Sequence, residues 1–339
     1  MIRDAAGLAA AGLIPEHAHT AIEAVGAQYA VAITPTMQAL IETPDDPIGQ
    51  QFVPDPAELV RLPHEAADPI GDDAHSPLAG LVHRYPDRVL LKPLLACPVY
   101  CRFCFRREHV GPGGGTLTAD QLDAAYDYIA ARPAIREVIL TGGDPLMLSP
   151  RRLRDMLARL GAIAHVELLR LHSRVPVADP GRVTAELAAA LRHDTPVWLL
   201  VHANHAREFT PDARSALRRL GAEGVGLLGQ SVLLRGVNDS PYALEALFRA
   251  MLRARVKPYY LHQLDPAPGT ARFDVPIAEG QRIVATLRGR VTGLAWPTYV
   301  LDIPGGHGKV PIGPEYLEEG AVRDPWGGLH ALAGPGDAV

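Results

Sequence analysis

Three cysteines lie within eight residues of each other, and the chain of 339 residues has no others. Cys97, Cys101 and Cys104 have the spacing C-x3-C-x2-C, with Phe103 directly before the third. Three thiolates on one short loop can bind three irons of a cubane [4Fe–4S] cluster, which leaves the fourth iron open for a ligand from outside the protein. A zinc site with His109 as fourth ligand is the alternative, although such sites usually take their ligands as two spaced pairs.

A second segment, from Leu301 to Pro311, places glycines directly before Lys309. Glycines allow a backbone to approach a ligand closely, and a lysine amine can form a Schiff base with pyridoxal 5′-phosphate (PLP). The segment does not have the spacing of a phosphate-binding P-loop, because Val310 stands where that motif has Ser or Thr. Taken alone, the segment is equally consistent with a surface turn.

The elements that must position these residues form an alternating pattern from residue 88 onward. Short apolar runs occur at Val89–Leu95, Val138–Leu140, Val166–Leu171, Val197–Val201, Val225–Leu234 and Tyr259–Leu264. Segments of helical period follow them at Ala119–Ala131, Pro150–Leu160, Val183–Arg192, Pro211–Leu220, Pro241–Ala254 and Ile277–Arg288. This alternation predicts βαβ units and a parallel sheet.

Six such units in about 200 residues predict an α/β protein with a partial (β/α)6 barrel. A doubly wound open sheet is the alternative. Short periodic segments before residue 80 predict a helical N-terminal region at 1–80, followed by the partial barrel at 81–290. Residues 291–339 are predicted to form a short C-terminal segment that carries Lys309.

Polar residues and glycines recur where the predicted strands end. In an α/β barrel this edge forms the active face, so these side chains are expected to lie together. After the cysteines come Gly142, Gly143, Asp144, Ser173, His202, Gln230 and Asp265.

The composition restricts the class of protein. The formal net charge of −5 gives no general attraction to nucleic acid. No run of 18 or more apolar residues occurs, so no membrane span is expected. Clustered free cysteines suit a reducing compartment, which favours the cytoplasm over an exported protein.

The cysteine motif, with an aromatic residue before Cys104, resembles the signature of radical S-adenosylmethionine (radical SAM) enzymes. In these enzymes S-adenosylmethionine (SAM) binds the open iron, and the fold is a partial barrel like the one predicted. The resemblance implies a [4Fe–4S] cluster on Cys97, Cys101 and Cys104. It also implies SAM contacts by Gly142, Gly143, Asp144, Ser173, His202 and Gln230.

Over residues 75–320 the chain further resembles the lysine 2,3-aminomutase family, whose members combine SAM with PLP. The matching stretches are residues 83–88, 97–107, 142–146, 172–174, 230–235, 258–260 and 304–309. By this resemblance Lys309 binds PLP covalently, and Arg84 and Arg88 are weaker candidates for contacts with PLP. Arg106 would pair with the substrate α-carboxylate, since a guanidinium fork suits a carboxylate.

The resemblance also implies a substrate. Asp265 and Asp302 match the two carboxylates that hold the side-chain ammonium of lysine in this family, and two neighbouring acids need a cation. The expected enzyme is an isomerase that shifts the amino group of L-lysine between C2 and C3 to give β-lysine. The alternatives are an aminomutase for another amino acid such as arginine, a radical SAM protein that has lost PLP-dependent mutase activity, or a degenerate paralogue that keeps the cluster as a redox or binding module.

Some features distinguish the chain within that family. His307 interrupts a run that is usually pure glycine, and His262 stands where catabolic members often have Tyr. The short form resembles the bacterial branch that makes β-lysine for elongation factor P, whereas the Pro304–Lys309 loop resembles the catabolic branch. Members of this kind take an electron from a donor such as flavodoxin or ferredoxin. The sequence is consistent with either a monomer or a homo-oligomer.

Overall fold

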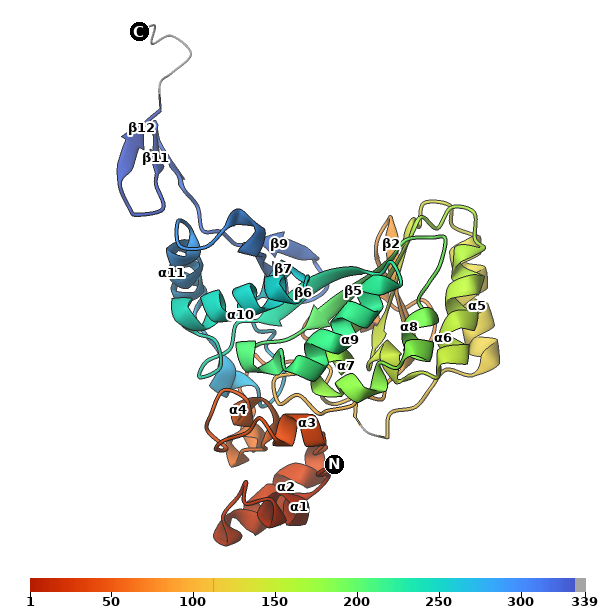
Figure 1. Cartoon of the computed structure of the whole chain (residues 1–339), viewed down its shortest axis with the longest axis horizontal. Coiled ribbons are helices and arrows are strands. Elements are labelled where there is room, and N and C mark those ends of the chain that lie inside the picture. The colour runs from red at the N-terminus through yellow and green to blue at the C-terminus, as the bar shows by residue number, and fades with distance from the viewer. Residues whose placement is uncertain (112, 333–339) are drawn as a thin grey trace, which may run out of the picture.

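The computed structural model describes residues 1–111 and 113–332, and within them the dominant element is one curled nine-stranded sheet (Figure 1). The strands follow one another in sequence order across the sheet. Neighbouring strands from β2 to β8 are parallel, and antiparallel β1 and β9 form the edges. The strands are β1 (Leu81–Tyr85), β2 (Arg88–Leu94), β3 (Glu137–Gly142), β4 (Leu168–Ser173), β5 (Val197–His202), β6 (Gly226–Val232), β7 (Lys257–His262), β8 (Thr298–Asp302) and β9 (Lys309–Pro311).

The sequence-based expectation of a partial α/β barrel is confirmed. The six predicted strands correspond to β2 through β7. The structure adds β8 as a further parallel strand and β9 as its hairpin partner, so Lys309 belongs to the main sheet. The last seven residues of the predicted C-terminal segment, 333–339, lie outside the described residues.

Helices cover the outer face of the sheet, as βαβ connections require (Figure 1). Most begin at a Ser or Thr whose side-chain oxygen accepts a backbone N–H, as Thr118, Ser149, Thr210 and Ser240 do. Their apolar faces and the sheet enclose the main hydrophobic core. The helices are α5 (Ala119–Ala130), α6 (Pro150–Gly161), α7 (Val175–Ala178), α8 (Ala185–Ala189), α9 (Pro211–Ala222), α10 (Pro241–Arg253) and α11 (Ile277–Leu287).

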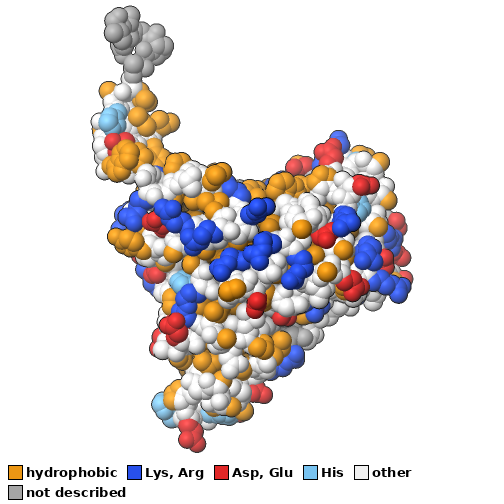
Figure 2. Space-filling view, viewed as in Figure 1, with side chains coloured by type: hydrophobic (Ala, Val, Ile, Leu, Met, Phe, Trp, Pro, Cys, Tyr) orange, Lys and Arg blue, Asp and Glu red, His pale blue; other side chains and the backbone are white. Residues whose placement is uncertain are grey.

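The outer faces of these helices are polar. Figure 2 shows Lys and Arg side chains gathered across the middle of one face, over the region where Figure 1 places α9 and α10. Both helices are amphipathic, with arginines such as Arg218 and Arg253 on one side and buried leucines on the other. None of the helices in the described part of the chain has the length and hydrophobicity needed to cross a bilayer.

The N-terminal region contains short helices, and their small hydrophobic core also includes Val99 and Ala178. The helices are α1 (Ala5–Ala10), α2 (His19–Gln28), α3 (Pro35–Gln38) and α4 (Gly49–Phe52). At the other end of the chain, β10 (Leu317–Glu318), β11 (Ala321–Arg323) and β12 (Leu329–Ala331) form a separate small sheet that stands away from the body (Figure 1).

The main sheet curls so far that its two edge strands touch. The backbone N–H of Lys309 in β9 donates a hydrogen bond of 2.7 Å to the Tyr85 hydroxyl of β1. Since β1 and β9 lie at opposite edges of the sheet order, this contact brings the two ends of the half-barrel together. The residues at the carboxyl ends of the parallel strands therefore surround one shared space.

Candidate active site

The carboxyl ends of the parallel strands carry most of the residues singled out from the sequence. The cysteine loop follows β2, Gly142 ends β3, Ser173 ends β4 and His202 ends β5. Gln230 lies in β6 directly opposite His202, Asp265 follows β7, and Asp302 ends β8. The predicted active face is therefore one edge of the sheet.

A buried ion network holds the cysteine loop. Glu58, from the N-terminal region, accepts hydrogen bonds of 3.0 Å from Arg102 Nε, and Arg107 also donates to it. All three side chains are fully buried. Burial raises the pKa of Glu58, but the two guanidinium groups outweigh this and the pKa stays below its usual value. Sequence reasoning missed Glu58, because it lies 44 residues before Arg102, in the short 3-10 helix Pro56–Leu59.

The three thiols are free and largely enclosed. Burial is the main reason why the pKa of Cys104 rises to about 11, and Arg174 Nη1 donates to Cys101 Sγ at 2.8 Å. Among the residues that the structure describes, no three Cys, His, Asp or Glu side chains converge as they would around a single ion. A cubane needs separated thiolates, since each binds a different iron, and the nearby guanidinium offsets part of their charge. The residues present therefore fit a [4Fe–4S] cluster.

The Gly142-Gly143-Asp144 turn is attached to the chain that leads into the cysteine loop. Gly143 N–H donates to Leu94 O at 2.8 Å, and a Cβ at Gly143 would lie 2.3 Å from Ala96 O. The Asp144 carboxylate accepts from the Ser173 hydroxyl at 2.7 Å and from the Arg174 N–H at 2.7 Å. Asp144 and Ser173 thus hold each other in place, and the neighbouring Arg174 contacts Cys101.

Two half-buried histidines each have one buried ring nitrogen that lacks a hydrogen-bond partner among the described residues. They are Nε2 of His172 and Nε2 of His202. Burial lowers the pKa of both rings, which keeps them neutral. The His202 ring centroid lies 5.6 Å from that of Phe103, the residue between two cysteines. The unpaired buried ring nitrogen of His202, beside the cysteine loop, fits a polar ligand such as SAM.

Lys309 lies in the β8–β9 hairpin, where its Cα is paired with that of Asp302. Its Nζ donates to the Asp302 carboxylate and lies 3.2 Å from His262 Nδ1. The same ammonium lies over the Tyr260 ring, 5.6 Å from its centroid. Burial would raise the pKa of Asp302, but His262 and Lys309 lower it to about 2. The amine is thus held beside the carboxyl ends of β7 and β8, where it fits a covalent bond to PLP.

Asp265 has fewer hydrogen-bond partners than Asp302. Its Oδ1 is buried and has no hydrogen-bond partner in the described part of the chain. Burial, followed by repulsion from Asp302, raises the pKa of Asp265 to about 7. A buried carboxylate in this state is stabilised by a cation that reaches both acids.

The three arginines predicted to bind anions lie in different surroundings. Arg84 and Arg106 both donate to Asp72, at 3.1 Å and 2.7 Å respectively. Arg88 begins β2, pairs with the exposed Asp87 at 2.7 Å and stacks on the Tyr85 ring at 3.8 Å. The structure therefore brings Arg84 and Arg106 together and leaves Arg88 apart from them.

Comparison with known protein families agrees with this geometry. Residues 91–246 match the model of the radical SAM superfamily, and residues 284–322 match the model described as lysine-2,3-aminomutase. The L-lysine 2,3-aminomutase of Acetoanaerobium sticklandii is 44% identical over 85% of this chain and 70% of its own length. That of Clostridium subterminale is 42% identical over the same shares. The glutamate 2,3-aminomutase of Clostridioides difficile is 37% identical over 87% of this chain and 70% of that protein.

The two matched models cover both chemical segments of the site, the cysteine loop and the segment of Lys309. The relatives are aminomutases, which are isomerases, and the radical SAM domain together with this family implies a [4Fe–4S] cluster, SAM and PLP as cofactors. The chain is therefore a radical SAM aminomutase and belongs to the lysine 2,3-aminomutase family.

Proposed function

We propose that this enzyme shifts the amino group of L-lysine between C2 and C3 to give β-lysine. The observation that carries the proposal is the pair of carboxylates, Asp265 and Asp302, beside Lys309. In the structure the Lys309 ε-ammonium binds Asp302, and it is the same chemical group as the side-chain ammonium of a lysine substrate.

The acid pair also discriminates against the substrate of the glutamate relative. A glutamate side chain would bring a third carboxylate to Asp265 and Asp302, and close like charges in a buried site are strongly unfavourable. A primary ammonium neutralises both acids instead. Arginine has the required charge but a larger, planar head group, so lysine is the preferred substrate.

The chain's own residues bind and orient the reactants. Asp265 and Asp302 hold the side-chain ammonium, Arg106 holds the α-carboxylate, and Lys309 presents its amine for attachment of PLP. Cys97, Cys101 and Cys104 would hold the cluster, and His202 and Gln230, which are paired across β5 and β6, would contact SAM beside it. When bound, SAM and PLP supply a carbon-centred radical and a carrier for the migrating nitrogen.

Three closely spaced free cysteines suit a reducing compartment, so we place the reaction in the cytoplasm. We expect an electron donor such as flavodoxin or ferredoxin to reduce the cluster.

The decisive experiment is Lys309→Ala in enzyme reconstituted without oxygen with iron, sulfide, PLP and SAM. Wild-type enzyme is expected to convert L-lysine faster than arginine and to leave glutamate unchanged. The variant should keep its iron content and lose turnover, because no other residue presents an amine at this hairpin.

Lys257→Ala is the matched control, since Lys257 begins β7 and donates to backbone carbonyls. This control should keep activity. Substantial turnover by Lys309→Ala would contradict the assignment of PLP to Lys309, and preferred conversion of glutamate would contradict the assigned substrate.

A further inference from the structure

One irregular segment of the N-terminal region, residues 68–76, contacts both chemical ends of the amino-acid site. At Gly71 a Cβ would lie 2.5 Å from the backbone nitrogen of Gly306, so the two chains touch backbone to backbone. His75 Nε2 lies 3.1 Å from Gly306 O. The segment is therefore packed directly against the loop that precedes Lys309.

The same segment provides the carboxylate of Asp72, which lies among three cations. Arg106 donates to its Oδ2 through Nε at 3.1 Å and Nη2 at 2.7 Å. Arg84 donates to Oδ1 at 3.1 Å, and Lys92 Nζ lies 3.7 Å from Oδ2. The four side chains are between 7% and 16% exposed, so solvent screens these charges only weakly.

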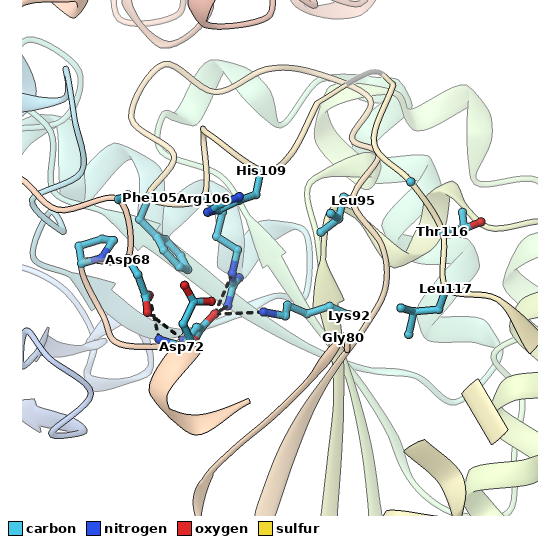
Figure 3. A pocket seen from close by; sticks show the side chains of 14 residues that line it. Asp68, Asp72, Gly80, Lys92, Leu95, Phe105, Arg106, His109, Thr116 and Leu117 are labelled. Carbon is cyan, nitrogen blue, oxygen red and sulfur yellow. Dashed lines mark hydrogen bonds and ion pairs between the residues drawn. The ribbon is translucent and has the colours of Figure 1, made fainter. Parts of the chain in front are cut away.

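Asp72 is held rigidly in this place. The Asp68 carboxylate accepts the backbone N–H groups of Asp72 and Asp73, each at 2.8 Å. Figure 3 shows Asp72, Lys92 and Arg106 converging at one side of a cavity of about 370 Å³. Arg106 uses only its Nε and Nη2 for Asp72, and its Nη1 takes no part in these bonds.

A guanidinium has two edges that can each face a carboxylate. Asp72 occupies the side edge of Arg106 and so directs the remaining edge. Two carboxylates on one guanidinium repel each other, but Arg84 and Lys92 supply the positive charge that allows both to be ionised. One bound carboxylate among three cations thus leaves room for a second anion.

We propose that Asp72 is a positioning residue that orients Arg106 toward the substrate α-carboxylate and ties it to the Lys309 loop. This inference rests on the proposed function, in which Arg106 binds that carboxylate. Through residues 68–76, the guanidinium and the loop of Lys309 keep a constant separation, which sets the position of the substrate carboxylate relative to the amine.

The test compares two ligands that differ only in the α-carboxylate, the group that Arg106 is proposed to bind. L-Lysine and 1,5-diaminopentane share the terminal amines, but the diamine lacks the carboxylate. Their dissociation constants are measured from the change in the PLP absorption band of PLP-loaded protein without SAM, so turnover is not required. The dissociation constant of the diamine divided by that of L-lysine reports the contribution of the carboxylate to binding.

In Asp72→Asn this ratio is expected to fall about tenfold or more, as for loss of a buried charged contact, while the affinity for the diamine stays near the wild-type value. Asp72→Glu keeps the charge and should recover part of the ratio. Asp73→Asn is the matched control, because Asp73 is the exposed neighbour, and it should leave the ratio unchanged. Equal weakening of both ligands in Asp72→Asn would overturn the proposal.

Arg106→Gln separates this inference from the function on which it rests. If Arg106→Gln keeps the wild-type ratio, Arg106 does not bind the carboxylate. This result would overturn both the role of Arg106 in the proposed function and the positioning role of Asp72. If Arg106→Gln brings the ratio close to one and Asp72→Asn leaves it at the wild-type value, only the positioning role of Asp72 is overturned. Should Asp72→Asn fail to fold, Asp68→Asn loosens the same turn, and a wild-type ratio in that variant would overturn the inference.

Discussion

The cysteine end and the lysine end of the site are built in opposite ways. Around the cysteine loop, charges are fully buried and paired within the protein, as in Glu58 with Arg102 and Arg107. Around Lys309, by contrast, the Asp265 carboxyl has a buried oxygen without a partner among the described residues. The lysine end therefore has a carboxylate that only a ligand completes, whereas Glu58, the carboxylate that holds the cysteine loop, is paired within the chain.

This difference separates a structural task from a binding task. A loop that must present three thiolates to a cluster gains from a preformed, rigid frame. A pocket that must take and release an amino acid gains from groups whose pairing improves when the ligand arrives. Substitutions at the two ends should accordingly change different measurable quantities.

The largest expected effect lies at the cysteine end, in Glu58→Gln. Loss of this carboxylate leaves Arg102 and Arg107 buried without their counter-ion, and breaking a buried pair costs about 3–5 kcal/mol. Denaturant unfolding of the metal-free protein measures the loss in the free energy of unfolding. Glu167→Gln, which breaks an exposed pair with Arg136, should cost at most about 1 kcal/mol. Similar losses in both variants would remove the contrast between the two ends.

The next effect lies at the lysine end, in Asp265→Asn. Removing one carboxylate of the acid pair should raise KM for lysine by an amount equivalent to about 2–5 kcal/mol of binding, with the iron content unchanged. Steady-state kinetics and iron analysis measure the two quantities. The exposed Asp274→Asn serves as control. A variant that keeps the wild-type KM, or one whose iron content falls, would contradict the assignment of Asp265 to the lysine end.

A pH profile sharpens the same point. The pKa of Asp265 is raised to about 7 and that of Asp302 is lowered to about 2, so both acids are ionised only above about pH 7. KM for lysine should therefore fall as the pH rises from about 6 to 8, by less than the tenfold per pH unit that one titrating group allows. Asp265→Asn should flatten this profile. A KM that rises with pH in this range would contradict the assignment.

The raised pKa of Asp265 also affects stability. Binding of lysine should improve as the pH rises, whereas the stability of the ligand-free enzyme should fall. Because the folded protein binds the Asp265 proton more tightly than the unfolded chain does, the ligand-free enzyme loses stability as the pH rises from about 4 to about 7. Saturating lysine should offset this loss. Thermal unfolding with and without lysine at several pH values is the measurement.

The smallest expected effect is that of Tyr85→Phe. The variant removes the hydroxyl that accepts the Lys309 N–H and joins the two edges of the sheet, which should cost about 0.5–1.5 kcal/mol. We expect a few-fold decrease in kcat, with normal iron content. Tyr242→Phe, at an exposed position on α10, should have no effect. A loss of iron in Tyr85→Phe would show that the two ends are coupled more strongly than their packing indicates.

Local patterns were sufficient to predict the parts of the molecule whose signals lie close together in the sequence. The strands β2 to β7 follow from short apolar runs, and the cysteines could be placed after β2 because they come directly behind the first of these runs. The strand β9 has only three residues and no periodicity, so the pairing of Lys309 with Asp302 could not be derived from pattern alone. Glu58 and Asp72 lie in or beside single-turn 3-10 helices far from their partners in the sequence, and no local signal links them to those partners.

The hairpin that carries Lys309 constrains the length of its loop more than its composition. Residues 303–308 connect Asp302 to Lys309, and positive φ angles occur at Gly305, Gly306 and Gly308 but not at His307. Position 307 therefore accepts a side chain, which explains how His307 can interrupt the glycines without moving the lysine. A loop shortened by one residue would have to close with fewer permissive positions or would place Val310 opposite Asp302. For this site, counting residues between the acid and the amine is a stricter test of a related sequence than matching its glycines.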